Sequence, residues 1–166
     1  MDQQWRRNSL RYQGYDYTQI GGVFVTLCTH HRQHLFGIVI DGQMAHSQAG
    51  ALACDRWRSI PDRFPEVAID EFVVMPDHVH GILWTGLGSQ TAERGATPGD
   101  VIRWFKATVH AGYRYGVLQE DWTQYDRHLW HRDYHDHVLR NDADLERIRQ
   151  YIASNPARWH ARRQTA

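Results

Sequence analysis

Two histidines one residue apart lie inside the apolar segment FVVMPDHVHGILW, residues 72–84. Successive side chains of a β-strand point to opposite faces, so His78 and His80 are predicted to share one face, with Val79 on the other. Two imidazoles on one face can hold a metal ion. A chain with 12 histidines gives about one His-x-His pattern by chance. The spacing alone therefore leaves open a metal site and a pair of hydrogen-bonded histidines.

A second candidate group lies in the segment DADLERIRQYIASNPARW near the C-terminus. Leu145, Ile148 and Ile152 form the apolar stripe of a predicted helix. Tyr151 and Asn155 are four residues apart and lie side by side on the shoulder of that stripe. They offer a phenol nucleophile and a neutral oxygen ligand. A half-buried aromatic residue and a helix-end asparagine before a proline explain the same pair, so both interpretations stand at this point.

The elements that position these residues follow from periodicity and capping signals. In chain order we expect a strand at 22–30, a helix at 48–60 closed by Pro61, strands at 66–75 and 78–84, a loop at 85–99, a helix capped by Thr97, a short edge strand within 129–140 and a helix from Asn141 to Pro156. Strands mixed with helices on one antiparallel sheet indicate an α+β fold. We predict a ferredoxin-like sandwich with an antiparallel sheet and helices, in a single domain over residues 1–166.

Composition is that of an ordinary globular chain, with 42% hydrophobic and 23% charged residues. No apolar run approaches the roughly 18 residues of a membrane span, and the start, MDQQWRR, lacks the apolar region of a signal peptide. We therefore expect a cytoplasmic protein that does not bind membranes. Cys28 and Cys54 form no CxxC pair and predict no disulfide framework.

Charge is distributed unevenly along the chain, although the formal net charge is zero. Residues 41–77 hold seven acidic residues and three arginines, whereas residues 127–166 hold eight arginines and five acidic residues. Residues 1–21 read as an irregular basic and aromatic arm. Arginine suits forked contacts with phosphate, and all but one of the basic residues are arginine. A solvated surface of an arginine-rich chain explains the same composition.

These segments, taken in order, resemble a known family. VVMPDHVHGIL resembles the "VMPNHVH" histidine–hydrophobe–histidine (HUH) segment of single-tyrosine transposases, and LERIRQYIASNPARW resembles their tyrosine helix, "YI..NP". FKATVH, WHRDYHDHVLRND and the N-terminal RRNSLRYQGYDYTQIGGVFVTLCTHHR, followed by LFG, are similar to segments of REP-associated tyrosine transposases. The likeness runs from about residue 6 to residue 159.

The resemblance implies a role for each matching residue. His78 and His80 match the metal-binding pair, Tyr151 the nucleophile and Asn155 the third polar ligand, while Asp77 departs from the commoner asparagine. The implied activity is that of a metal-dependent endonuclease and strand transferase acting on single-stranded DNA beside a hairpin, typically a repetitive extragenic palindrome. It proceeds through a 5′-phosphotyrosine, and the implied cofactor is Mg²⁺ or Mn²⁺.

DNA contacts are expected from arginines, which bind phosphates, and from tyrosines, which stack on unpaired bases. The candidates are Arg6, Arg7, Arg11, Tyr12, Tyr15, Arg147, Arg158, Arg162 and Arg163. Such a protein would be associated with the nucleoid. Whether two chains form a homodimer by exchanging tyrosine helices stays open.

Two other functions compete with this interpretation. One is a domesticated relative that binds hairpin DNA without cleaving it. The other is a metal-dependent hydrolase of small phosphate esters that uses the histidine cluster at 128–137. Tyr134 is a rival nucleophile, but Asp133 and Asp136 beside it would repel a phosphate and disfavour a tyrosinate.

Overall fold

The computed structural model describes residues 21–87 and 95–164. Residues 1–20 of the predicted arm and residues 88–94 of the predicted loop therefore lie outside the described residues. So do five of the candidate DNA contacts, namely Arg6, Arg7, Arg11, Tyr12 and Tyr15.

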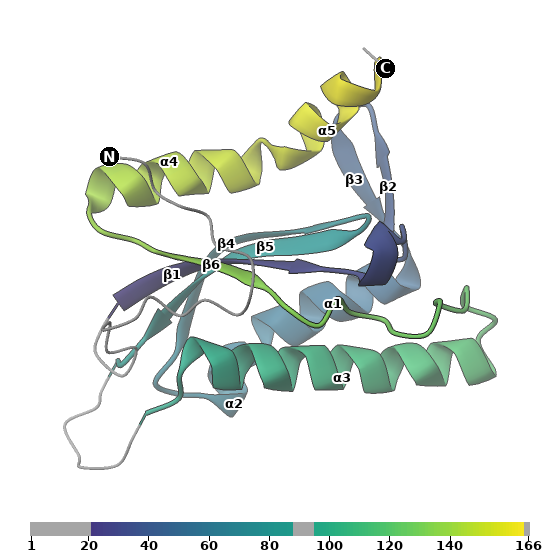
Figure 1. The fold of residues 1–166 in the computed structure, drawn as a ribbon, viewed down its shortest axis with the longest axis horizontal. Helices are drawn as coiled ribbons and strands as arrows, with labels where there is room; N and C mark the ends of the chain where they lie inside the picture. The colour runs from purple at the N-terminus through teal and green to yellow at the C-terminus, as the bar shows by residue number, and fades with distance from the viewer. Residues whose placement is uncertain (1–20, 88–94, 165–166) are drawn as a thin grey trace.

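A four-stranded antiparallel sheet is the centre of the fold (Figure 1). Its strands are β1 (Gly21–Cys28), β4 (Ala68–Met75), β5 (His78–Thr85) and β6 (His135–Val138), in the spatial order β4-β5-β1-β6. Helices connect the first of these strands to the second and the third to the fourth. If β1, β4, β5 and β6 are counted as the first to fourth strands of this sheet, their spatial order starting from β6 is 4-1-3-2. This is the ferredoxin-like arrangement, and the predicted fold class is confirmed.

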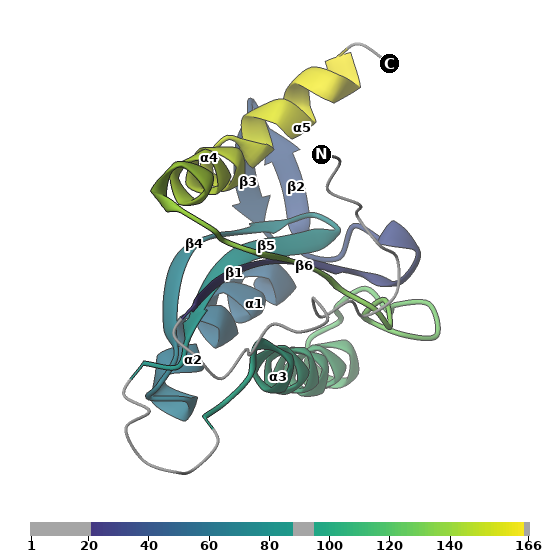
Figure 2. The same ribbon diagram turned by 60° about the vertical axis from the view of Figure 1, so that its left-hand side comes forward.

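Helices cover both faces of the sheet (Figure 2). The helices α1 (Gln48–Arg58), α2 (Ile60–Arg63) and α3 (Pro98–Gln119) lie on one face, and α4 (Asp142–Ala153) and α5 (Asn155–Gln164) lie on the other side. Alternation along β1 explains the two faces, because Val23 and Val25 join the large core beneath α1 and α3, whereas Phe24 joins a small cluster beneath α4. Within the described ranges, no helix is long and apolar enough to cross a membrane.

The helix signals before α3 are confirmed in detail. Thr97 caps α3, its side chain accepting from the backbone N–H of Asp100, whose carboxylate accepts from the Thr97 N–H in return. Val101, Phe105 and Val109 recur at every fourth position along α3 and are fully buried. The end of α1 was predicted wrongly, because α1 stops at Arg58. Pro61 lies in the first turn of α2, where a backbone N–H has no partner within the helix and proline is therefore tolerated.

Besides α2, four elements were not predicted. A hairpin of β2 (Gly37–Ile40) and β3 (Gln43–His46), and a short 3₁₀ turn η1 (His30–Arg32), follow β1, and α5 follows α4. Pro156 was expected to end the last helix, but it lies in the first turn of α5, where proline is tolerated. Tyr151 and Asn155 therefore lie on two successive helices rather than on one.

Asp70 on β4 fastens α4 to the sheet. Its carboxylate accepts two hydrogen bonds from Arg149, at 2.9 Å from Nε and 2.7 Å from Nη2, and a third from Trp84 Nε1 at 3.1 Å. The Arg149 guanidinium is the main cause that lowers the pKa of Asp70 to about 2. The side chain of Asp70 is only 15% exposed, so this pair is shielded better than an ordinary surface ion pair.

Replacing Asp70 tests this attachment. The folded-state pKa lies below the unfolded value of about 3.9, so the charge stabilises the fold above pH 4 and the contribution is lost as pH falls toward 2. We expect Asp70→Asn to lower the free energy of unfolding by about 1 to 2 kcal/mol at pH 7, a figure discounted because Arg149 is partly exposed. Urea unfolding at pH 7 and pH 2.5 measures it. Asp55→Asn, in an exposed pair with Arg58, is the control and should change little. A loss that is equal at both pH values would contradict the assignment.

Candidate functional site

A cleft of about 870 Å³ lies between the sheet and the two C-terminal helices. It is lined by all four residues that sequence patterns singled out for chemistry, His78, His80, Tyr151 and Asn155. They come from three elements, β5, α4 and α5. The structure therefore brings together residues up to 77 positions apart along the chain.

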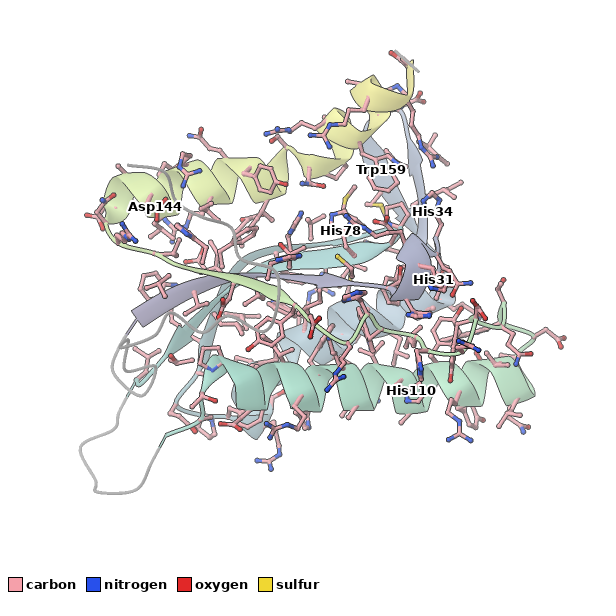
Figure 3. All side chains as sticks on the ribbon, in the orientation of Figure 1. His31, His34, His78, His110, Asp144 and Trp159 are labelled. Carbon is pink, nitrogen blue, oxygen red and sulfur yellow. The ribbon has the colours of Figure 1, made fainter. Side chains whose placement is uncertain are left out.

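The two histidines share a face of β5, as the alternation predicted. Their ring centroids are 4.5 Å apart, and both residues are about 95% buried. Figure 3 shows His78 between the sheet and the C-terminal helices, with Trp159 of α5 near it. On the opposite face, Gly81 meets Trp57 of α1, and a Cβ at that position would lie 2.2 Å from the indole ring. The strand that carries the imidazoles is thus pressed directly against the core.

Hydrogen bonds fix one nitrogen of each ring. Nδ1 of His80 lies 2.8 Å from the hydroxyl oxygen of Thr26, its neighbour across β1, and Nδ1 of His78 lies 2.5 Å from the carboxylate of Asp77. Arg32 pairs with the same carboxylate at 3.6 Å. Within the described residues no hydrogen bond engages Nε2 of either histidine. This is the pattern of metal-binding histidines, whose second ring nitrogen is held by an outer partner.

His80 is held in its neutral form. Burial is the main cause that lowers the pKa of His80 to about 2, and the neighbouring His78 and Arg32 add to it. Neutral imidazole is the form that binds metal ions. The His80 ring therefore keeps the form that a cation would require.

Tyr151 reaches into the cleft beside the histidines. Its ring meets Phe24 edge-on at 6.0 Å and lies 5.3 Å from the His80 ring, while the Arg158 guanidinium lies 5.0 Å from its centre. Its hydroxyl has no hydrogen-bond partner among the described residues. Asn155, the first residue of α5, is 8% exposed and lines the same cleft.

Three of the predicted DNA-binding arginines also line the cleft, namely Arg147, Arg158 and Arg162. Arg147 forms an ion pair with Asp144, whose carboxylate also lies 2.8 Å from Nε2 of His137. Arg163 does not line the cleft. Its guanidinium lies over the ring of Trp159, 5.3 Å from the ring centre.

Sequence patterns missed several lining residues, including Thr26 and Arg32. Thr26 lies beside His80 only because of the strand register, which no local pattern fixes. The rival nucleophile Tyr134 packs against the large core beneath α1 and α3, and the ammonium group of Lys106 lies 6.0 Å from its ring. It does not line the cleft.

Comparisons with known proteins show what this chain is similar to. No family model matches the chain. An uncharacterized protein of Haemophilus influenzae is 33% identical over an alignment 168 residues long, which takes in 92% of this chain and 89% of that protein. The structure of a REP-associated tyrosine transposase bound to a REP hairpin matches with a TM-score of 0.61 and 19% identity, over 90% of this chain and 73% of that one. A putative transposase from Deinococcus radiodurans matches with a TM-score of 0.48 and 19% identity, over 87% and 95% of the two chains.

The fold is therefore that of the REP-associated tyrosine transposases, and the resemblance seen in the sequence is confirmed at the level of fold. The chain itself belongs to the same family as the uncharacterized Haemophilus influenzae protein.

The low pKa of His80 predicts how stability depends on pH in the metal-free protein. Below about pH 6.5 the unfolded chain binds a proton at this residue that the folded chain does not, so acid favours unfolding. We expect the free energy of unfolding to fall by up to about 1.4 kcal/mol more per pH unit in the wild type than in His80→Gln. Urea unfolding in EDTA between pH 7.5 and 5 measures both slopes. Equal slopes would show that His80 takes up a proton in the folded protein.

Proposed function

We propose that the chain is a metal-dependent endonuclease and strand transferase that cleaves single-stranded DNA beside a hairpin through a covalent bond to Tyr151. The observation that carries this proposal is the convergence of a buried imidazole pair, a phenol and an amide in one cleft. A fold shared with a transposase bound to a REP hairpin supports the choice of substrate. We propose that the protein acts in the cytoplasm, at the nucleoid, where such a substrate is found.

The residues present fit a divalent cation. Other groups hold the Nδ1 atoms of His78 and His80, and Asn155, which lines the same cleft, offers an amide oxygen. This donor set suits Mg²⁺ or Mn²⁺, and its nitrogen ligands favour Mn²⁺. When bound, the ion supplies a Lewis acid that neutralises charge on the scissile phosphate.

The covalent step uses the phenol of Tyr151. Its oxygen bonds to the phosphorus and gives up its proton, while the bond from phosphorus to the 3′ oxygen breaks and that oxygen leaves as a 3′-hydroxyl after taking up a proton. The product is a 5′-phosphotyrosine that conserves the bond energy, so a 3′-hydroxyl can reverse the step without ATP. Arg158 lies beside the ring and offers a positive charge to the developing phenolate.

Positive charge around the cleft suits a nucleic-acid backbone. Arg32, Arg147, Arg158 and Arg162 come from η1, α4 and α5 and all line it. We propose that the last three contact phosphates, together with Arg163 on α5 and with Arg6, Arg7, Arg11, Tyr12 and Tyr15 outside the described residues. Arg32 is partly neutralised by Asp77, so its main effect is on the His78 side of the site.

The competing functions make different use of the same residues. A binding protein that does not cleave would need the arginines but neither Tyr151 nor the buried histidine pair. A phosphate-ester hydrolase would use His135 and His137, which also line the cleft, and would form no bond to Tyr151. A covalent adduct between protein and DNA separates all three functions.

Tyr151→Phe is the decisive variant. The hydroxyl has no partner in the described structure, so its removal should leave folding and hairpin binding unchanged while abolishing the adduct. The assay uses a hairpin oligonucleotide with a single-stranded flank, incubated with Mn²⁺ and run on a denaturing gel. Tyr134→Phe is the matched control and should retain the adduct. An adduct that persists in Tyr151→Phe and maps by peptide mass to residue 134 would overturn the assignment.

Salt dependence tests the arginine contacts. Each phosphate contact contributes roughly 0.7 to 0.9 to the slope of log K against log salt, so the double variant Arg158→Gln/Arg162→Gln should reduce the slope by about 1.5. Fluorescence anisotropy of the hairpin between 50 and 300 mM salt measures the slope. The control, Arg103→Gln/Arg114→Gln, removes two exposed arginines of α3 on the far side of the sheet and should leave the slope unchanged. Equal affinity for blunt duplex and hairpin DNA would contradict the proposed substrate.

A further inference from the structure

A second group of metal-type ligands lies outside the cleft. His30 and His31 on η1 and Asp126 in the segment between α3 and β6 place one ligand atom each within 4.8 Å of one another. None of the three lines the cleft. Figure 3 shows His31 on the turn that follows β1. Two imidazoles and a carboxylate are a donor set found in zinc sites that keep a fourth position for water.

One backbone–backbone hydrogen bond and one backbone–side-chain hydrogen bond hold the two segments together. The N–H of His30 donates to the carbonyl of Leu129 at 3.0 Å, and the N–H of Asp126 donates to the side-chain oxygen of Gln33 at 3.0 Å. Nδ1 of His31 lies 3.3 Å from the carboxylate of Asp126, 95 residues along the chain. His31 and Asp126 are exposed, but these hydrogen bonds join the segments that carry the three ligands.

The imidazole of His30 points to a missing partner. Its Nε2 is buried and makes no hydrogen bond in the described part of the chain, and a buried polar atom without a partner is unfavourable. Its ring stacks on His31 with 3.8 Å between centroids, and the His128 ring lies 5.3 Å away. The His30 ring thus lies directly against a second imidazole, and both offer a nitrogen that can bind a metal ion.

The backbone of η1 allows adjacent histidines to face one another. His31 and Arg32 have φ values of 53° and 56°, in the left-handed region that non-glycine residues rarely adopt. This turn brings the ring of His31 onto that of His30, although successive side chains of a strand would point apart.

We propose that His30, His31 and Asp126 form a second metal site that binds a divalent transition-metal ion of the zinc class, separate from the cleft. A bound ion would join η1 to the segment before β6. It would thereby fix the turn that carries Arg32, which pairs with Asp77 behind His78. The ligand set stands on its own geometry and does not depend on the reaction proposed for the cleft.

Metal stoichiometry tests this site without any measurement of activity. The background variant is His78→Ala/His80→Ala, which removes the cleft pair. Equilibrium dialysis against Zn²⁺ with elemental analysis should give one equivalent bound, and Co²⁺ should give visible absorption bands that Zn²⁺ abolishes. Adding His30→Ala/His31→Ala should weaken binding at least tenfold and remove the bands. The matched control adds His34→Ala/His160→Ala, two histidines outside both sites, and should retain one equivalent.

The intact protein gives a second measurement in case the background variant folds poorly. Wild type should bind two equivalents of Zn²⁺, and His30→Ala/His31→Ala should bind one. Binding that is unchanged by this pair of substitutions, or no Zn²⁺ beyond the equivalent lost with His78 and His80, would overturn the second site. Neither result would bear on the adduct at Tyr151, so failure of this proposal and failure of the cleavage reaction are separable.

Discussion

The ion pair between Asp70 and Arg149 is the constraint on which the cleft depends. The apolar contact beneath α4 is small, a cluster centred on Phe24, Ile82, Ile148 and Ile152, whereas the helices on the other face share the large core. The forked, shielded contact therefore contributes much of what keeps α4 on the sheet. Together with the ring contacts of Tyr151 to Phe24 and His80, it sets how far the phenol lies from the histidines.

The histidines also have a rigid support, on the face of the sheet away from α4. The strand that carries them lies between β4 and β1 and is pressed against Trp57 through the bare backbone of Gly81. Thr26 and Asp77 then set the orientation of each ring. The aspartate that replaces the family's commoner asparagine is not merely a turn residue, since its charge is shared between His78 and Arg32.

Local signals predicted what depends on local physics. Alternation placed His78 and His80 on one face, and the N-cap signal at Thr97 located the start of α3. The hairpin of β2 and β3 was missed although its signal was present: Asp41 and Gly42 form a two-residue turn with positive φ at both positions. The break before Asn155 was misread because proline both ends a helix and begins one. The pairing of Thr26 with His80, and of His31 with Asp126, depends on register and tertiary packing, which no local pattern contains.

The interruption at Ser154 separates the nucleophile from the amide that faces it. Tyr151 lies on α4, which is anchored to the sheet. Asn155 begins α5, which packs on the hairpin of β2 and β3, where a Cβ at Gly42 would lie 3.4 Å from Ala157. The phenol and the amide thus lie on two helices that pack against different parts of the fold. Substitutions in the hairpin act first on the position of the amide, and substitutions on the sheet surface act first on the phenol, so the two halves of the site can be tuned independently.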